Sequence, residues 1–138
     1  VQPQHAMDDR DVIARFWGTP AGIPYAFNSL HKAGTKLLMG SDAPVAPLDP
    51  WLAISAAVFG TESSDREPFK PEQCLDFETA LASSTAVGRV ALRDADAADL
   101  VLLDCDPSVI DSPEAMRAMP EHVLGTMLAG RWTYQQAE

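Results

Sequence analysis

The sequence predicts an α/β fold, in which helices alternate with the strands of a buried sheet. Val1-Gln2-Pro3 has the character of a strand end, and helical spacing follows it. Residues 36–39, Lys-Leu-Leu-Met, then form a short apolar run just before Gly40. A run without polar–apolar alternation is typical of a strand buried on both faces of a parallel sheet. Strand, helix and strand within the first forty residues therefore predict a βαβ unit.

Two helices are expected between those strands. After a polar loop around His5 and Asp8, Asp9 is predicted to cap a helix that stops at Gly18. One face of this helix is apolar and carries Val12, Ile13, Phe16 and Trp17. Pro24 suits the first position of the second helix, because its fixed φ is already helical.

The middle of the chain predicts two more helices and a loop between them. Asp49 supplies a cap and Pro50 a first residue for a helix that runs to Gly60. Residues 61–74 are polar and contain two prolines, which predicts a long surface loop. Asp76 is then expected to cap a helix that continues through Val87.

The last forty residues predict a small set of strands. Short apolar and β-branched runs alternate there with turn residues, which is the pattern of hairpins. The expected elements are a strand at 100–103, a short helix at 112–119 capped by Ser112, and strands at 123–128 and 132–134 joined by a turn at Ala129-Gly130.

Composition excludes several classes of function. The chain has 138 residues, enough for one compact domain and too few for two ordinary ones. Its net charge of -10 argues against nucleic-acid binding, because phosphates require a basic surface. The apolar runs are all shorter than the roughly 20 residues of a membrane helix. Cys74 and Cys105 form neither a C-x-x-C pair nor a disulfide framework, which favours a reducing cytoplasm.

Asp42 is the first candidate for a catalytic residue. It stands just past the carboxyl end of the predicted strand at 36–39, where α/β proteins place ligands and catalytic groups. A carboxylate there can bind a divalent metal or take a proton from a metal-bound water. On Gly-Ser-Asp alone, the alternative is that Ser41-Asp42 only caps the turn before Pro44.

His5 is the second candidate, because it follows the other predicted strand end. If the two strands are neighbours in a parallel sheet, His5 and Asp42 lie on the same edge and could converge. The alternative is an ordinary polar histidine in a loop. His31 lies within a predicted helix and His122 beside the late strands, so both are expected to be structural.

Four segments, read in order, form a family pattern. These are Val1-Gln2-Pro3-Gln4-His5-Ala6, Gly40-Ser41-Asp42-Ala43-Pro44-Val45, Pro47-Leu48-Asp49-Pro50 and Ala98-Asp99-Leu100-Val101-Leu102-Leu103-Asp104. With these segments the chain resembles the amidohydrolase superfamily, and within it the N-substituted formamide deformylase-like metal-dependent hydrolases. The resemblance covers nearly the whole sequence.

The resemblance implies the C-terminal part of a TIM (β/α)₈ barrel, with strands seven and eight and the helices after them. Residues 1–92 would belong to the barrel, and residues 93–138 would be the C-terminal share of a small β-domain. Asp42 would be the strand-eight aspartate, which binds the metal and accepts a proton, and His5 would contact the substrate. A complete barrel needs about 250 residues, so this chain would be a fragment.

The implied function is hydrolysis of a non-peptide carbon–nitrogen bond, amide or formamide, by a metal-activated water. The metal would be divalent, with zinc expected in the complete enzyme and none held stoichiometrically by this chain. The expected partners are a small amide-type substrate and either further copies of the chain or the preceding part of the barrel. Three alternatives remain, namely a non-catalytic assembly module, a split enzyme completed by another polypeptide, and an unrelated small α/β binding protein.

Overall fold

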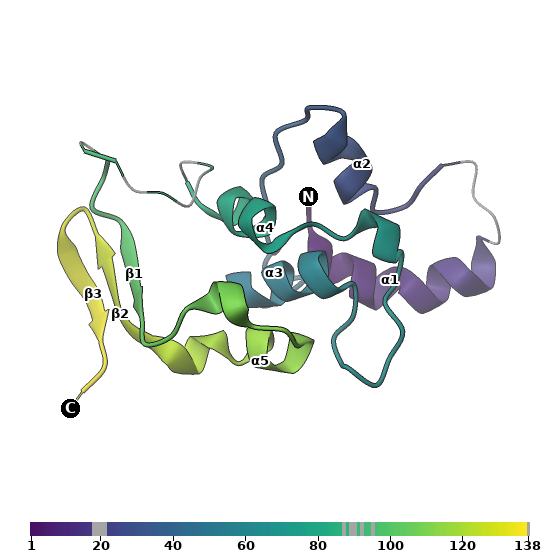
Figure 1. Cartoon of the computed structure of the whole chain (residues 1–138). Coiled ribbons are helices and arrows are strands. Elements are labelled where there is room, and N and C mark those ends of the chain that lie inside the picture. Colours follow the sequence, from purple (N-terminus) through teal and green to yellow (C-terminus); the bar gives the residue numbers. More distant parts are fainter. Residues whose placement is uncertain (18–21, 87, 89–90, 92, 95, 138) are drawn as a thin grey trace.

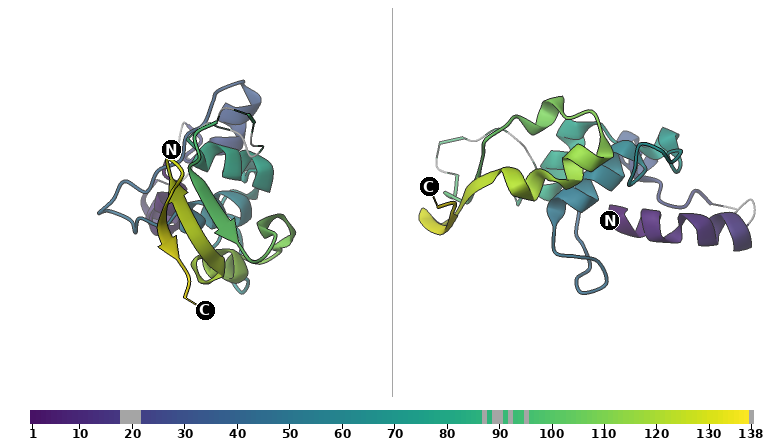
Figure 2. Two further views of the ribbon diagram at one scale, coloured as in Figure 1. Left: turned by 90° about the vertical axis from the view of Figure 1, so that its left-hand side faces the viewer. Right: turned by 90° about the horizontal axis from the view of Figure 1, so that it is seen from below.

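The helices and the strands occupy opposite ends of an elongated molecule (Figures 1 and 2). This computed structural model describes residues 1–17, 22–86, 88, 91, 93–94 and 96–137. The α-helices are α1 (Pro3–Phe16), α2 (Phe27–Lys32), α3 (Pro50–Phe59), α4 (Phe77–Ser84) and α5 (Pro113–Arg117). Short 3-10 turns are η1 (Pro71–Gln73), η2 (Pro107–Val109) and η3 (Met119–His122), and the strands are β1 (Leu100–Leu103), β2 (Val123–Leu128) and β3 (Arg131–Gln135).

Helix α3 begins and ends as predicted. The Asp49 carboxylate accepts the backbone N–H of Trp51, and Pro50 occupies the first turn. Gly60 ends the helix with a φ of 64°, a left-handed conformation that glycine adopts without a Cβ clash. The predicted caps of α4 at Asp76 and of α5 at Ser112 are likewise confirmed, with carboxylate or hydroxyl oxygens accepting backbone N–H groups.

Helix α3 is the centre of the core. Ser55 is its single polar side chain, and residues 53–57 are all buried, so the helix must be covered on every side. It contacts α1, α4 and α5. Ile54 of α3 and Met116 of α5 are among the most buried large side chains of the described ranges. Ser55 donates its hydroxyl hydrogen bond to the Pro113 carbonyl, which satisfies the one buried polar group of this helix.

The three late strands form an antiparallel sheet in the order β1-β2-β3, and this confirms the predicted strands. Ala129 and Gly130 both have positive φ, of 49° and 77°, which is the pattern of the two-residue turns that match strand twist. The Asp99 carboxylate accepts the Ala129 backbone N–H and ties this turn to the start of β1.

The N-terminal prediction was wrong in part. Residues 3–16 form one helix, so His5 and Asp8 lie in α1 and not in a loop, and Asp9 is not a cap. Pro3 stands at the first helical position, where its missing N–H costs nothing and its φ is already suitable. Gly18, predicted to stop the helix, and Val87, predicted to extend α4, lie outside the described residues.

The βαβ unit is present only as a single pairing. The Val1 amino group donates to the Leu38 carbonyl at 2.8 Å, and Gly40 N–H donates to the Val1 carbonyl at 3.1 Å. These two bonds flank Met39 in the pattern of parallel neighbours. Met39 N–H donates in turn to the Ser83 carbonyl at the end of α4. Residues 36–39 are thus extended, but the structure forms no regular strand there, because among the described residues the extended neighbour that pairs with them is Val1 alone.

The predicted apolar face of α1 is mostly uncovered. Ile13 is buried, whereas Phe16 and Trp17 are 68% and 60% exposed. The far end of α1, which carries these side chains, points away from the sheet (Figure 2). The helices of this chain therefore close a core around α3 and leave the end of α1 open.

Replacing Ile54 with alanine should lower the free energy of unfolding by about 2–5 kcal/mol, because the site is 2% exposed and a cavity would remain. Urea unfolding followed by circular dichroism would measure it. Leu48→Ala is the matched control, since that side chain is 84% exposed and its loss should cost less than about 0.5 kcal/mol. Equal losses at both positions would contradict the central place of α3.

Replacing Glu114 with glutamine should reduce stability near neutral pH and have little effect near pH 2. Both carboxylate oxygens accept hydrogen bonds from Ser64, its backbone N–H at 2.6 Å and its hydroxyl at 2.7 Å. The backbone N–H contributes most and lowers the pKa of Glu114 to about 2. A lowered folded-state pKa gives stability that is present above about pH 4.5, the ordinary value, and is lost as pH falls through about 2.

The measurement is the urea midpoint of both proteins across that pH window. The difference in urea midpoint between the two proteins should be largest above about pH 4.5 and should shrink to nearly zero as the pH approaches 2. Glu121→Gln is the control, because this exposed glutamate makes no side-chain hydrogen bond with the described residues. A difference that stays constant with pH would show that the Ser64 contact does not depend on the charge.

Candidate functional site

Asp42 lies at the carboxyl end of the extended segment 36–39, as predicted. Its φ is 57°, a left-handed conformation that aspartate tolerates and that is uncommon outside glycine. Ser41 Oγ accepts the Ala43 N–H, and Val45 N–H donates to the Asp42 carbonyl. The turn is thus held by the Ser41 hydroxyl and by the main chain. The Asp42 carboxylate is exposed and makes no hydrogen bond with the described residues. It therefore takes no part in holding the turn and is available to bind a ligand.

A small hollow of about 220 Å³ lies beside the start of this turn. Gly40 and Ser41, which directly precede Asp42, line it together with Met39, and α3 supplies Pro50 and Ala53. The hollow is at the carboxyl end of the extended segment, which is the edge where α/β proteins carry out chemistry.

His5 lies in the first turn of α1 and is half-buried. Its Nε2 atom is shielded from solvent and has no hydrogen-bond partner among the described residues. A buried polar atom without a partner is costly, and such atoms often mark a functional site. The pairing of Val1 with Met39 brings the segments that lead to His5 and to Asp42 side by side. Within the described ranges, neither residue belongs to a group of three or more His, Cys, Asp or Glu side chains close enough to hold one ion.

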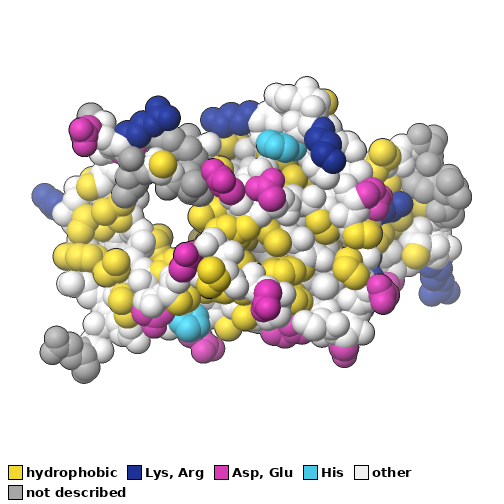
Figure 3. Space-filling model, viewed as in Figure 1, with side chains coloured by type: hydrophobic (Ala, Val, Ile, Leu, Met, Phe, Trp, Pro, Cys, Tyr) yellow, Lys and Arg dark blue, Asp and Glu magenta, His cyan; other side chains and the backbone are white. Residues whose placement is uncertain are grey.

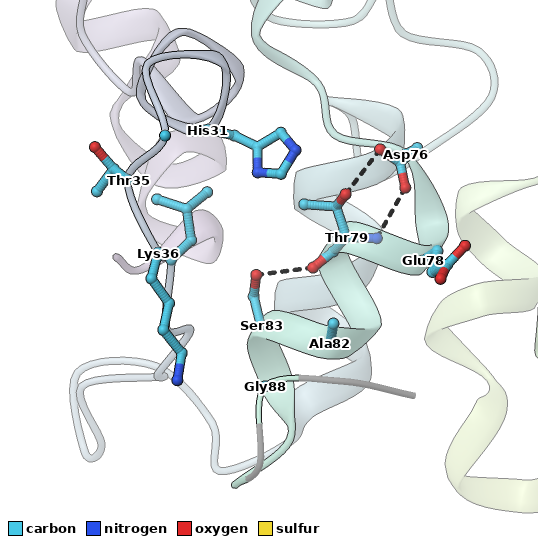
Figure 4. A pocket seen from close by; sticks show the side chains of 11 residues that line it. His31, Thr35, Lys36, Asp76, Glu78, Thr79, Ala82, Ser83 and Gly88 are labelled. Carbon is cyan, nitrogen blue, oxygen red and sulfur yellow. Dashed lines mark hydrogen bonds between the residues drawn. The ribbon is translucent and has the colours of Figure 1, made fainter. Parts of the chain in front are cut away.

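A larger pocket lies elsewhere and has a different character. It holds about 600 Å³, is open to solvent, and lies at the amino end of the extended segment. Figure 4 shows His31 pointing from α2 towards α4, where Asp76, Thr79 and Ser83 face it. Asp76 accepts both the backbone N–H and the hydroxyl of Thr79, and Ser83 donates to the Thr79 carbonyl. The Thr79 N–H is the main cause that lowers the Asp76 pKa. These polar groups of α4 therefore bond within the helix itself.

A third group of side chains lies where the sheet meets the helices. Asp104 and Cys105 follow β1, and His122 directly precedes β2. The ligand atoms of these three residues all lie within 4.8 Å of one another. His122 Nδ1 and Asp104 Oδ1 are 2.8 Å apart, within hydrogen-bonding distance. His122 was expected to be structural, and the sequence does not connect it with Cys105, because 16 residues of unrelated character lie between them in the chain.

The two thiols differ in what surrounds them. Burial is the first cause that raises the pKa of each, and the charge of a neighbouring carboxylate adds to it. That carboxylate belongs to Glu72 for Cys74, and for Cys105 it is Asp104, which also hydrogen-bonds the thiol. Cys105 Sγ lies 3.8 Å from Met119 Sδ, and Met119 is fully buried. Without a bound cation, both cysteines are therefore held as thiols.

A protein-family model matches the chain along almost its entire length. The model describes an amidohydrolase family, and the match covers residues 1–134. The chain belongs to the amidohydrolase family. Amidohydrolases generally use divalent metal ions.

A plant protein is also similar to this amidohydrolase chain. Protein LONG AFTER FAR-RED 3 of Arabidopsis thaliana is 30% identical over 145 residues, which cover 97% of this chain and 24% of the plant protein. The chain thus spans about a quarter of the length of that relative. No solved structure gives a significant match. Across the described ranges, we find no helix with the length and apolar character that crossing a membrane requires.

Proposed function

We propose that this chain is the C-terminal part of a metal-dependent amidohydrolase and that Asp42 is its strand-eight aspartate. The observation that carries the proposal is the free Asp42 carboxylate, held in a left-handed turn just past the segment that pairs in parallel with Val1. The substrate class is a non-peptide amide, and the resemblance to the formamide deformylase-like branch favours an N-substituted formamide. The cytoplasm is the proposed compartment.

The donors of the chain suit zinc but do not complete a site. Asp42 offers a carboxylate oxygen, which zinc accepts, whereas the unpartnered Nε2 of His5 is assigned to the substrate. A catalytic zinc takes three protein ligands and keeps a position for water, so at least two ligands must come from elsewhere. The 24% coverage of the plant relative supports a longer protein in which residues 1–92 complete a barrel and residues 93–138 complete a β-domain.

The chemistry assigned to this chain is proton transfer and substrate placement. When bound, the metal polarises the carbonyl and makes a water molecule acidic enough to attack at neutral pH. The Asp42 carboxylate takes a proton from that water and returns it to the leaving nitrogen as the carbon–nitrogen bond breaks. Ser41 and Val45 fix the turn, so Asp42 holds its position without reorganisation. His5 contacts the substrate at the same edge.

The exposed apolar side chains favour a second role, association with a partner. Phe16 and Trp17 at the end of α1 are more than half exposed, as are Val45 and Leu48 beside the Asp42 turn. Apolar side chains also gather on the sheet and between the helices on the face in Figure 3. Apolar patches of several hundred Å² are unusual on soluble monomers. The proposed occupant is the preceding part of the barrel, or a second copy when the chain is isolated.

Replacing Asp42 with asparagine in the longer protein should reduce turnover by at least about 10²–10⁴-fold, because the shape is kept and the proton acceptor is lost. The assay is release of formate from N-substituted formamides, or of amine from simple amides, by the zinc-loaded protein. Asp76→Asn is the control, since asparagine caps a helix as well as aspartate does. If the variant kept more than about a tenth of the activity, Asp42 would not be the proton acceptor, and its role would be only to form the turn.

The isolated chain should self-associate at micromolar concentration, because the apolar side chains at the end of α1 lack cover. Sedimentation equilibrium measures the mass directly. A double replacement, Phe16→Ser with Trp17→Ser, should shift the chain towards the 14.9 kDa monomer. Val109→Ser, at another exposed apolar side chain, serves as the control. A monomeric parent chain would show that the chain needs no partner to cover its surface.

A further inference from the structure

We propose that Asp104, Cys105 and His122 form a binding site for one zinc-type divalent ion at the junction of the sheet and the helices. This site is separate from Asp42 and independent of the proposed hydrolase activity. Carboxylate, thiolate and imidazole are the three side chains that zinc binds in proteins. Each of the three residues here contributes one of them.

The backbone around the site is already fixed. Leu103 of β1 pairs with Val123 of β2, so the residues just outside this pair, Asp104 and His122, face each other. The Asp104 N–H donates to the His122 carbonyl at 3.1 Å and continues the ladder beyond the strands. The register shift between Leu102 and Leu103 is a β-bulge or irregularity, a feature that often re-aims the side chains next to it.

The distances suit a tetrahedral ion after small side-chain rotations. With Zn–S of about 2.3 Å and Zn–N and Zn–O of about 2.0–2.1 Å, tetrahedral ligand atoms stand about 3.3–3.6 Å apart. The three atoms here lie within 4.8 Å, so the widest separation closes by roughly 1 Å. His122 Nδ1 and Asp104 Oδ1, at 2.8 Å, open slightly as the ion takes the place of the bridging proton. The Cys105 thiol releases its proton to solvent and binds as thiolate.

The surroundings favour zinc over softer and harder ions. Met119 is fully buried, and its sulfur lies 3.8 Å from Cys105 Sγ, so one side of the thiolate is shielded from water. A thioether is a soft ligand that suits Cu(I), whereas an aspartate oxygen in the same set suits a harder ion. Zinc accepts oxygen, nitrogen and sulfur together, and because the Asp104 and His122 side chains are partly exposed, water from the solvent can supply a fourth ligand. Magnesium and calcium require oxygen ligands, which a cysteine and a histidine do not offer.

A surface ion pair between His122 and Asp104 is the competing account. Such exposed pairs are common and are worth at most about 1 kcal/mol. An ion pair makes no use of the third residue, whereas a zinc-type site depends on the Cys105 sulfur. The role of Cys105 therefore separates the two accounts.

The test is a titration of the 138-residue chain with Co²⁺, a spectroscopic substitute for zinc. We expect one equivalent to produce a sulfur-to-cobalt charge-transfer band that zinc then abolishes by displacement. Cys105→Ser should remove the band, and His122→Ala and Asp104→Asn should each weaken binding by at least about tenfold. Cys74→Ser is the matched control and should leave the band unchanged. Asp42→Asn should leave it unchanged too, which separates this site from the proposed catalytic one.

A second measurement needs no substitution and so survives any failure of a variant to fold. In the zinc titration of the wild-type chain, the ¹³Cβ resonance of Cys105 should move and that of Cys74 should stay in place. Absence of the cobalt band, a band that persists in Cys105→Ser, or a shift of both cysteines together would overturn the proposal. Stoichiometric Cu(I) uptake without any cobalt band would likewise overturn the assignment to zinc.

Discussion

Burial of α3 is the constraint on which the rest of the structure depends. A helix that is apolar on every side is stable in water only when other elements cover all of it. Helices α1, α4 and α5 supply that cover, although they come from the beginning, the middle and the last third of the chain. The loop after α3 follows the same requirement, since Leu75 N–H donates to the Ala57 carbonyl and Phe69 N–H to the Gly60 carbonyl. The turn that presents Asp42 closes at Val45, and residues 46–49 connect it to the start of α3, so the position of the candidate site depends on this core.

The parts of the fold that local chemistry decides were predictable from the sequence. Asp49, Asp76 and Ser112 cap helices as expected, because each side chain needs only backbone N–H groups within three residues. The hairpin turn at Ala129-Gly130 is equally local. The segment 36–39 failed to become a regular strand for the opposite reason. A buried parallel strand needs neighbours on both edges, and Val1 provides a single residue of pairing. The start of α1 was misjudged because the proline at position 3 fits a strand end and a first helical turn alike.

The two candidate sites differ in the same way, because one follows from a local segment and the other depends on contacts between distant segments. Asp42 could be found from the sequence because its position follows directly from the apolar run before it. The Asp104–Cys105–His122 group could not be found from any one segment, since it depends on the register between β1 and β2. One signal for it was nevertheless available. Once residues 100–103 and 123–128 are expected to pair as antiparallel strands, the residue after the first strand lies opposite the residue before the second. A wrong register by one residue would place these side chains on opposite faces.

The two sites also differ in what holds them together. The edge that carries Asp42 offers two donors from different segments, and the rest of its chemistry depends on elements beyond those that surround it here. The Asp104 and His122 backbones of the second site are paired, and the Cys105 sulfur contacts Met119, which belongs to the same core cluster as Ile54. Leu103 of β1 packs against that cluster as well. An ion held by Asp104, Cys105 and His122 would add a bonded link at this junction. Its role would be to fix the sheet against the helices, whereas the role of Asp42 would be catalytic.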